Sequence, residues 1–531
     1  MSKPQHVAPS SGCAGTVSRW RLSSRKPAGV WAIVFALAAS GCAGVPFDAP
    51  KTPSAAEPPA RASRAGRVAA PWLDGSGKSG FVPIGAGEAA LGARLRLIEE
   101  AEHSIDAQYF LMKADLSAAL VAQALIEAAD RGVRVRFLLD DVFTTASDES
   151  LAILDARPNL EVRIFNPVSR SGPQWLAFLR DFSRTNRRMH NKSFIMDGSM
   201  VIVGGRNIAD EYYAVEQEIE FADFDVFGAG PVAMDVSRSF DLFWNSNLAV
   251  PLDALIDEDT RVAAAESRIG DRAEPLQLAR AREVYDGAVE DQLFRDLRAG
   301  RIEPIDGYGI VVTDSPAKLG YPVGSGLEEL FSDISSRMEA AKREIVIVTP
   351  YFVPRREGVA LLKSLRERGV DIIVITNSLA STNHPYVHGG YFPYRKELLE
   401  AGVRIYEAKA DAAISQLTGE PVSLTLHTKA ILIDRETVFI GSLNYDPRSI
   451  ELNSEMGVFI ESPEFGAMFA EAIEDDMPAF VYEVGLDEDG RTVWRYGNGD
   501  SMRIWRSEPG ASGWEKFVAR ITSLLPVEGQ L

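Results

Sequence analysis

One chemical pattern occurs twice in this chain, and the repeat constrains the fold more than any other feature. The pattern is histidine, one residue, lysine, four residues and aspartate. It begins at His190 and again at His427, 237 positions later. The triplet Arg131-Gly132-Val133 recurs as Arg368-Gly369-Val370 with the same separation. Equal offsets at two distant landmarks indicate an internal duplication, so we expect two halves that share one fold.

Each copy of the pattern continues in the same way. An apolar strand follows the lysine, and a second apolar run then ends in glycine and asparagine, at residues 200–207 and 437–444. A histidine and a lysine two positions apart on a strand point to the same face. The glycines let the backbone approach a ligand closely, and the asparagine amide can donate to a phosphate oxygen. The pattern therefore predicts a phosphate-handling site built from both halves.

The duplicated H-x-K-x4-D pattern resembles the signature of the phospholipase D superfamily. Other stretches resemble its bacterial cardiolipin synthase branch, in particular the C type: Tyr351-Phe-Val-Pro354, Arg356-Glu-Gly358, 377–382, 394–403 and 444–449. The resemblance runs from about Gly85 to the C-terminus. It implies an α/β fold of two pseudo-twofold-related domains, each a mixed, mostly parallel sheet flanked by helices, with one active site at their interface.

The resemblance implies covalent catalysis, in which one histidine attacks phosphorus and the other protonates the leaving oxygen. We assign His190 as the nucleophile and His427 as the acid, and the reverse assignment stays open. No metal or other cofactor is expected, because lysines supply the positive charge. The residues expected to bind phosphate are Lys192, Lys429, Asn207 and Asn444.

The remaining members of the two copies are expected to support the site. Asp197 and Asp434 complete the catalytic patterns, but their odd offset from histidine points them to the other face of the strand, so they shape the site instead of doing chemistry. Arg206 is a candidate phosphate contact in the first copy. Ser442, which has no counterpart hydroxyl in the first copy, is a candidate substrate contact in the second.

A carboxylate is also needed to orient each histidine. In the second half the candidate is Glu455. In the first half, spacing from the asparagine suggests Glu218, whereas the match of residues 222–227 to residues 454–459 suggests Asp223, which we favour.

Helical and strand periodicities alternate along both halves, as expected for sheets covered by helices. The expected helices are 86–103, 116–129, 327–341 and 358–368, and the expected strands are 104–110, 135–140, 344–352 and 371–377. We assign a first domain to 81–252, a charged helical connector to 253–305, and a second domain with a C-terminal extension to 306–531. The extension is expected to hold a hairpin at Asp487–Gly490 and an amphipathic helix at Trp514–Leu525, both as packing elements.

The N-terminus has the pattern of an export signal. Residues 1–41 carry a basic stretch and then an apolar run too short to span a membrane, which is typical of a secretory leader. Ala39-Ser-Gly-Cys42 resembles a bacterial lipobox, so we expect lipidation of Cys42; an ordinary leader with an incidental Cys42 is the alternative. Residues 42–80, rich in Pro, Ala, Gly and Ser, are expected to form a flexible linker. The expected location is a membrane-anchored lipoprotein outside the cytoplasm, on the inner or outer membrane.

Two further segments stand out beside the motifs. Residues 168–188 interleave arginines with Trp175, Phe178 and Phe182, which suits either an interfacial helix or a helix packed on the core. Residues 383–394 hold histidines and tyrosines that could contact a glycerol or head group, or form a structured loop. Metal binding by these histidines is not expected, because no carboxylate or cysteine cluster shares their spacing.

Charge and cysteine content narrow the function classes. The chain has a net charge of −19, so its body is a poor platform for a nucleic-acid backbone. Its two cysteines exclude a disulfide framework. We expect phospholipids at a membrane surface as partners, and phosphatidyl transfer to phosphatidylglycerol or a similar acceptor as the reaction. Phospholipase D hydrolysis, a phosphodiesterase or nuclease, and a non-catalytic scaffold are the alternatives, and the oligomeric state stays open.

Overall fold

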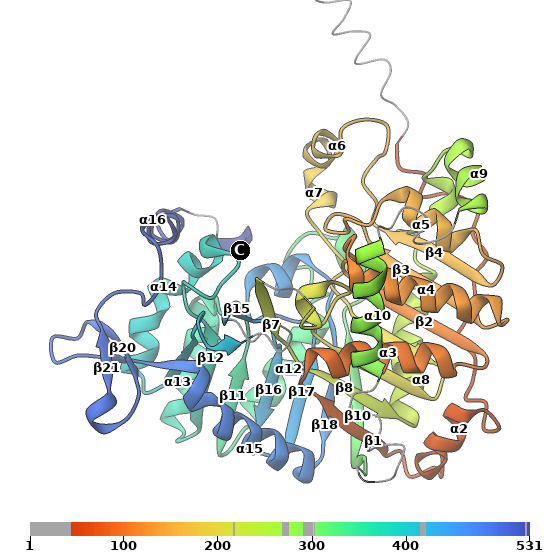
Figure 1. The fold of residues 1–531 in the computed structure, drawn as a ribbon. Coiled ribbons are helices and arrows are strands. Elements are labelled where there is room, and N and C mark those ends of the chain that lie inside the picture. Colours follow the sequence, from red (N-terminus) through yellow and green to blue (C-terminus); the bar gives the residue numbers. More distant parts are fainter. Residues whose placement is uncertain are drawn as a thin grey trace, which may run out of the picture. The chain divides into compact units, whose positions relative to one another are not determined.

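Two mixed β-sheets, each covered by helices, organise the computed structural model (Figure 1). The structure describes residues 44–215, 218–267, 275–289, 301, 303–414, 421–525 and 528–530. Residues 45–531 form one compact unit. The predicted leader and Cys42 lie outside the described residues. Within the described ranges, no helix is both long and apolar enough to cross a membrane.

The first sheet has the strand order β1-β8-β6-β5-β2-β3-β4-β9. Parallel pairing is confined to β2, β3 and β4, and the strands that carry the first motif, β5 and β6, are antiparallel to their neighbours. The bounds are β1 (Ser79–Ile84), β2 (Ser104–Tyr109), β3 (Arg134–Asp140), β4 (Leu160–Phe165), β5 (Ser193–Met196), β6 (Met200–Gly204), β8 (Asp225–Ala229) and β9 (Ala249–Pro251).

The second sheet repeats this plan, in the order β10-β18-β17-β16-β11-β12-β13-β19-β20-β21. Parallel pairing is again confined to three strands, β11, β12 and β13. The predicted mixed α/β sheet in each half is thus confirmed, with its parallel part limited to three strands and the other strand pairs antiparallel. The bounds are β10 (Ile305–Thr313), β11 (Glu344–Val348), β12 (Asp371–Asn377), β13 (Arg404–Ala408), β16 (Ala430–Ile433), β17 (Thr437–Gly441), β18 (Met456–Glu461), β19 (Val481–Leu486), β20 (Thr492–Tyr496) and β21 (Arg503–Trp505).

Helices cover the sheets in two layers. On the outer faces, α3, α4 and α5 pack on the first sheet and α12, α13 and α14 on the second. On the inner faces, α8 and α15 share one apolar core with both sheets. The bounds of the helices are α2 (Arg64–Ala69), α3 (Gly87–Glu100), α4 (Leu116–Asp130), α5 (Asp148–Asp155), α6 (Gln174–Arg180), α7 (Phe182–Thr185), α8 (Pro231–Trp244), α9 (Glu258–Glu266), α10 (Pro275–Val289), α12 (Glu329–Glu339), α13 (Arg355–Glu367), α14 (Pro385–Glu400), α15 (Pro463–Phe480) and α16 (Gly513–Thr522).

Short turns complete the fold: η1 (Ala70–Trp72), η2 (Asp210–Tyr212), η3 (Leu252–Ala254), η4 (Pro316–Gly320), the π-turn η5 (Arg448–Leu452), η6 (Gly499–Ser501) and η7 (Glu528–Gln530). The segment expected to connect the halves contains α9 and α10, and α10 packs against α3. The predicted hairpin is present, because β19 and β20 pair across the turn at Asp487–Gly490.

The repeated Arg-Gly-Val triplet ends the same helix in each half. Gly132 and Gly369 adopt left-handed backbone conformations, with φ of +94° and +87°. The amides of the valines that follow, Val133 and Val370, donate back into the last turns of α4 and α13. Glycine is needed because a Cβ disfavours this conformation. The triplet is therefore a helix-ending signal that sets the direction of the next strand, β3 or β12.

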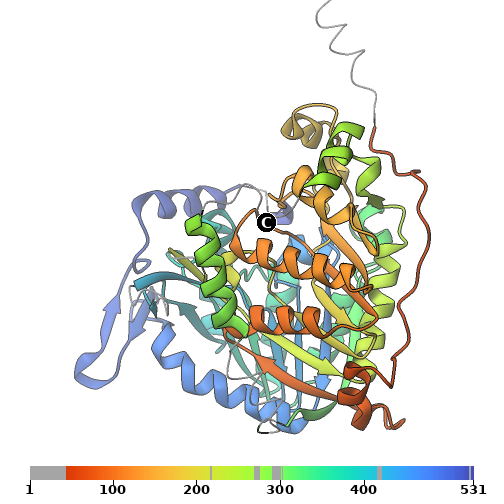
Figure 2. The ribbon, with the colours of Figure 1, turned by 45° about the vertical axis from the view of Figure 1, so that its right-hand side comes forward.

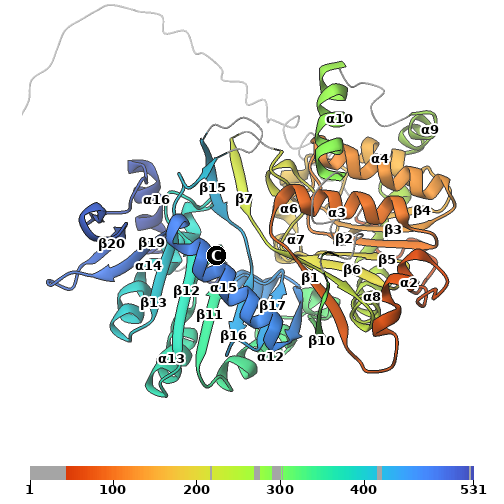
Figure 3. The same ribbon diagram turned by 60° about the horizontal axis from the view of Figure 1, so that its bottom comes forward.

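Strand pairing joins the two halves at two places. β1 and β10 pair antiparallel, which makes the two sheets continuous. β7 (Ile219–Ala222) from the first half pairs parallel with β15 (Pro421–Leu426) from the second, and β14 (Ala413–Ile414) adds to the edge of β15. Figure 3 shows β7 and β15 side by side between the sheets. Since β7 and β15 lie just before Asp223 and His427, this pairing places the two halves of the site.

The segment predicted to be a flexible linker is instead packed on the first half. Figure 2 shows the chain before α2, in red, running along the side of that half. The Lys51 ammonium donates to the carbonyls of Ser246 and Ala249 at 2.6 and 2.8 Å. The Ser54 hydroxyl accepts from the Trp244 indole at 3.0 Å. The composition of this stretch resembles a tether, but its polar groups satisfy donors and acceptors at the end of α8.

Candidate active site

The two motif histidines enter the site along backbone that pairs with the opposite half. The His190 amide donates to the Ser454 carbonyl at 2.9 Å, and the His427 amide donates to the Ala222 carbonyl at 2.8 Å. Ser454 and Ala222 occupy equivalent places, each one residue before a candidate carboxylate. The arrangement is therefore pseudo-twofold, and each histidine is held next to the carboxylate of the other half.

Each histidine side chain pairs with a carboxylate from the other half of the chain. His190 Nδ1 lies 2.8 Å from Glu455 Oε2, and His427 Nδ1 lies 2.6 Å from Asp223 Oδ2. The sequence named both carboxylates, but it grouped each with its own half and did not predict the exchange. Glu218, the alternative to Asp223, is exposed at the margin of the cavity. An Nδ1–H donated to a carboxylate leaves Nε2 free for chemistry.

The residue after the glycine that ends the second motif strand differs between the halves, Gly205 in one and Ser442 in the other. This difference accounts for an aspartate beside one and a glutamate beside the other. A Cβ at Gly205 would lie 2.2 Å from Asp223 Oδ1, so a side chain there would displace this carboxylate. The equivalent position in the second half is Ser442, whose hydroxyl donates to Glu455 Oε2. Ser442 is fully buried and does not line the cavity. The predicted substrate contact at Ser442 is therefore wrong, and the hydroxyl positions Glu455.

Arg206 is also not a phosphate contact. Its guanidinium is buried and donates to the backbone carbonyls of Tyr212, Ile84, Gly85 and Asp223. Buried carbonyls need donors, and an arginine offers five. Arg206 thus fixes the backbone of the residue that carries the His427 carboxylate, and the cavity lies elsewhere.

The motif aspartates lie far from the chemistry, at the opposite ends of their strands. Asp197 accepts from the amides of Glu102, His103 and Ser104. In the second half, Asp434 accepts in the same way from the amides of residues 342–344. Each carboxylate fixes the loop between a helix and the central parallel strand. Their expected role in shaping the site is corrected to a role in fixing the fold.

The lysines and asparagines surround the histidines from two sides. Lys192 and Lys429 are buried, and each ammonium donates to the carbonyl of its own motif histidine. Asn207 and Asn444 line the cavity, and in each the side-chain oxygen lacks a hydrogen-bond partner among the described residues. The amide nitrogens already donate one hydrogen bond each, from Asn207 to the Tyr212 hydroxyl at 3.0 Å and from Asn444 to the Ser449 hydroxyl at 3.2 Å, so each keeps one N–H for a ligand. The lysines place positive charge behind the imidazoles.

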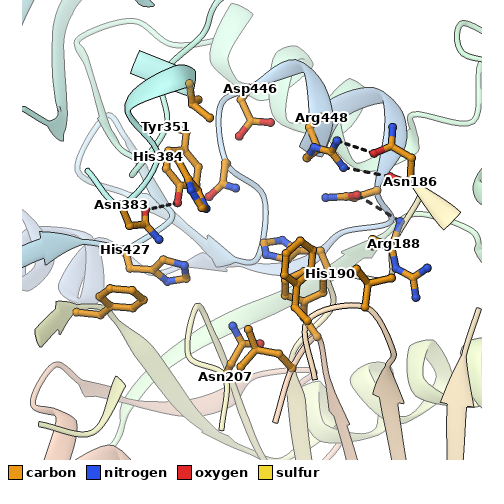
Figure 4. A pocket seen from close by; sticks show the side chains of 18 of the residues that line it. Asn186, Arg188, His190, Asn207, Tyr351, Asn383, His384, His427, Asp446 and Arg448 are labelled. Atoms are coloured by element: carbon orange, nitrogen blue, oxygen red, sulfur yellow. Dashed lines mark hydrogen bonds between the residues drawn. The ribbon is translucent and has the colours of Figure 1, made fainter. Parts of the chain in front are cut away.

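A cavity of about 820 Å³ contains both histidines. Figure 4 shows His190 and His427 facing it from different segments, with Asn207 below and Asp446 above. One wall is aromatic, formed by Phe110, Phe143, Phe178 and Phe182. Another part of the lining is polar and is called the polar wall, formed by Tyr351, Asn383, His384, Tyr386, Asp446 and Arg448.

The polar wall contains functional candidates to which the sequence gave no role. Asp446 is almost fully buried, accepts from the Ser449 amide at 2.8 Å and lines the cavity. Tyr351 donates to Asn383 at 2.6 Å. Both tyrosine and aspartate fall in stretches that carry the family resemblance, and this was the available signal. Of the 383–394 segment, Asn383, His384 and Tyr386 reach the cavity.

Comparison with known proteins places this geometry in a family. The family described as "Cardiolipin synthase, PLD-like domain" matches residues 95–244 and 334–477, which together make up more than half of the chain. This chain belongs to the phospholipase D superfamily. Cardiolipin synthase C of Escherichia coli K12 is 38% identical over 472 residues, covering 85% of this chain and 96% of that protein.

Two further similarities agree with this assignment. An uncharacterised protein of Helicobacter pylori strain 26695 is 31% identical over 441 residues, covering 82% of this chain and 86% of that protein. Phosphatidylserine synthase of Haemophilus influenzae has a similar fold, with a TM-score of 0.54 at 12% identity, covering 88% of this chain and 100% of that chain. The duplicated phospholipase D-like halves predicted from the sequence are thus confirmed.

Burial shifts the pKa values of the histidines, lysines and carboxylates at this site. It lowers the pKa of His190 well below its usual range, and Lys192 lowers it further. Burial likewise lowers the pKa of His427 to about 3 and that of Lys429 to about 8. Burial raises the pKa of Glu455 to about 7, although Lys192 opposes the change. An anionic phosphate in the cavity would raise the pKa of His427 and of both ammonium groups, which favours the protonated acid and the charged lysines. His190 must stay neutral to attack phosphorus, and its strongly lowered pKa suits that role.

Asp223 behaves differently from Glu455. Burial acts to raise the pKa of Asp223, but the charges of His427 and Lys429 outweigh burial, and the pKa is lowered. The His427 carboxylate is therefore the more strongly ionised of the two. An ionised carboxylate stabilises the imidazolium form of its partner, which suits His427 as the proton donor.

One cluster of histidine and carboxylates among the described residues has the spacing of a metal site. It consists of His388, Glu407 and Glu508, all buried. The Arg395 guanidinium already lies among them, 2.9 Å from His388 Nε2, 3.0 Å from Glu407 and 2.8 Å from Glu508. The Arg395 guanidinium therefore occupies the place that a metal ion would take. Its contacts connect α14 with β13 and the C-terminal extension.

Proposed function

We propose that this protein is a cardiolipin synthase that transfers a phosphatidyl group to phosphatidylglycerol or a similar acceptor. The observation that carries the proposal is the pair of histidines on one cavity, each backed by a carboxylate from the other half. Two imidazoles whose Nδ1 atoms are held by carboxylates can supply one nucleophile and one proton carrier through Nε2. The similarity to a cardiolipin synthase over nearly its whole length supports a phospholipid as substrate.

The reaction proceeds in two displacements at phosphorus. His190 Nε2 attacks the phosphodiester of the donor lipid, and the bond from phosphorus to the head-group oxygen breaks. His427 gives its proton to that oxygen, so the head-group alcohol leaves and a phosphatidyl-histidine remains. The acceptor hydroxyl then transfers its proton to His427 and attacks phosphorus, which releases His190 and forms the product diester. Lys192 and Lys429 stabilise the charge that builds on the phosphate oxygens.

The two cavity walls suit the two parts of the substrates. The aromatic wall can cover the glyceride side of the donor. The polar wall offers hydrogen-bond partners to the acceptor hydroxyls: burial raises the pKa of Asp446 to about 7, so its carboxyl can donate or accept. An acceptor held at Asp446 would compete with water for the phosphatidyl-histidine. This polar wall supports transfer over hydrolysis.

A lipid assay tests the proposal. The purified protein is incubated with phosphatidylglycerol alone and with added phosphatidylethanolamine, and the products are separated. Cardiolipin is the expected product, whereas phosphatidic acid alone would assign a hydrolase. His190→Ala should abolish all turnover, and His103→Ala, which alters an exposed histidine outside the cavity, should leave it intact. Full activity of His190→Ala would refute covalent catalysis at this residue.

We further propose that the protein is a lipoprotein held at a membrane outside the cytoplasm through Cys42. The basic leader and the lipobox-like sequence before Cys42 support this location. Mass spectrometry of the N-terminal peptide should show an acylated Cys42, and Cys42→Ala should shift the protein from the membrane fraction to the soluble fraction. An unmodified Cys42 at the mature N-terminus would reject the anchor.

A further inference from the structure

The C-terminal helix α16 carries its apolar stripe on the outside. Trp514 is 70% and Phe517 is 55% exposed, and their rings stack on one another. Ile521, Leu524 and Leu525 continue the same exposed row at helical spacing. The inward side is Ala519, whose carbonyl packs against Gly389 of α14. A helix on the surface of a water-soluble protein normally shows the opposite arrangement, with its apolar stripe toward the core.

A second exposed apolar surface lies on α6 and α7. No residue of α6 is buried, and Trp175 and Leu179 are mostly exposed. Packing of these side chains on the core, one of the two interpretations of the sequence, is therefore wrong. Phe178 of α6 and Phe182 of α7 line the cavity, so this surface begins at the active site and extends outward.

Both surfaces border the mouth of the same cavity. α16 packs on α14, whose first turn contributes Tyr386 to the polar wall. The chain after α16 returns to the cavity at Gln530, which accepts from the Asn186 amide at 2.8 Å. In Figure 1, α16 lies at the upper left and α6 and α7 at the upper right, with the C-terminus between them. We name α6–α7 and α16, with their exposed apolar side chains, the mouth surface.

Charge on the mouth surface is opposite in sign to the rest of the chain. Its exposed aromatic residues alternate with Arg180, Lys516 and Arg520, while the chain as a whole carries −19. The nearby acids are already engaged: Asp181 pairs with Arg184 at 2.6 Å, and Glu515 caps α16. Outward tryptophans and leucines mixed with cations match the boundary between head groups and acyl chains in an anionic bilayer.

We propose that the mouth surface docks directly on a bilayer that contains anionic phospholipid, so that lipids enter the cavity without crossing water. The proposal rests on the proposed function in one respect, that the substrate is a bilayer lipid. It adds a second attachment beside the N-terminal anchor. An anchor alone holds the protein near a membrane, whereas the mouth surface fixes which side faces it.

Vesicle binding tests the docking. The full chain is used with Cys42→Ala in every sample, so that no acyl anchor contributes, and is sedimented with vesicles of phosphatidylethanolamine and phosphatidylglycerol. Trp514→Glu with Phe517→Glu should lower the partition coefficient about tenfold or more, because apolar burial is replaced by charge. The matched control is Val68→Glu with Leu242→Glu, at residues of comparable exposure on α2 and α8, which should change binding less than about twofold.

Two further measurements separate the possible failures. Vesicles with brominated acyl chains should quench tryptophan fluorescence, and Trp514→Phe should remove part of the quenching, a readout that needs no charge substitution. Short-chain, monomeric phosphatidylglycerol should be turned over equally by the glutamate variant and the control, since neither alters the cavity.

Equal vesicle binding by the glutamate variant and the control would overturn the docking surface and leave the proposed function standing. Loss of a dimer in place of loss of vesicle binding would assign the surface to a second copy of the chain and also overturn the proposal. Vesicle binding that depends on Trp514 without turnover of any phospholipid would support docking while rejecting the proposed function.

Discussion

Replacing Asp223 by asparagine tests the exchanged histidine–carboxylate pairs directly. Asparagine has the same size, so the buried space beside Gly205 stays filled and only the charge is lost. The Asp223 carboxylate raises the pKa of His427, against the larger effect of burial. Without it the pKa of His427 falls further, the imidazolium is less populated, and protonation of the leaving oxygen becomes slower.

The structure sets the size of this effect. The His427 Nδ1 to Asp223 Oδ2 distance is 2.6 Å, and both side chains are nearly or fully buried. A hydrogen bond to a charged group contributes about 1.5–3 kcal/mol, which corresponds to about 10- to 150-fold in rate. Because Asp223 does not line the cavity, KM should change little and the loss should fall on kcat.

The assay is steady-state turnover of phosphatidylglycerol in mixed micelles, together with NMR of histidine side chains labelled with 13C. The chain has six histidines, so each signal can be assigned by substitution. Asp223→Asn should shift the His427 signal and leave His190 in place. The matched control is Asp235→Asn, the same substitution on α8 of the same half but outside the cavity, which should leave kcat within about twofold.

An unchanged kcat in Asp223→Asn would refute the role of this carboxylate. A shift of the His190 signal in place of the His427 signal would show that each histidine pairs within its own half.

Three other variants test roles that the structure gives to Arg206, Asp197 and Asp446. Arg206→Met should destabilise the protein by about 3–5 kcal/mol in urea unfolding, because several buried backbone carbonyls lose their donor, with KM unchanged in the folded fraction; a raised KM at full stability would restore the phosphate contact. Asp197→Ala should cost about 2 kcal/mol through three amides left without their acceptor, without lowering kcat; a large loss of kcat at full stability would contradict this. The raised pKa of Asp446 means that wild-type stability falls as pH rises from about 4 to about 7, since a buried carboxyl must ionise, whereas Asp446→Asn lacks this loss. The variant should therefore gain thermal stability relative to wild type between pH 5 and 7, and a constant difference would show that Asp446 does not titrate there.

Local signals predicted most of the fold. The strand at Asp371–Asn377 and the start of α4 at Leu116 lie where the apolar runs put them, because this signal acts within a few residues. The histidines were also found, since the motif repeats its own spacing. Asp223 was found through the local match of residues 222–227 to residues 454–459, whereas repeated spacing pointed to Glu218. Because the motif occurs twice, a residue in one copy can be matched to its equivalent in the other copy from this single sequence.

Contacts between distant segments could not be predicted in this way. The exchange of Glu455 and Asp223 depends on how the halves pair at Ser454 and Ala222, and no spacing within one half encodes that pairing. Arg206 follows the glycines as a phosphate ligand would, and only the folded backbone shows the carbonyls that it binds. The segment before α2 has the composition of a linker, and its partners at the end of α8 lie 190 and 191 residues away.

The exchange of carboxylates makes catalysis conditional on assembly. A half of this chain that folded alone would contain a histidine without its carboxylate and a carboxylate without its histidine. The junction between the halves is therefore itself part of the catalytic machinery, and any loosening there would disable both steps of the reaction together. Substitutions that slightly separate β7 from β15 should behave like active-site lesions, although they touch neither substrate nor imidazole.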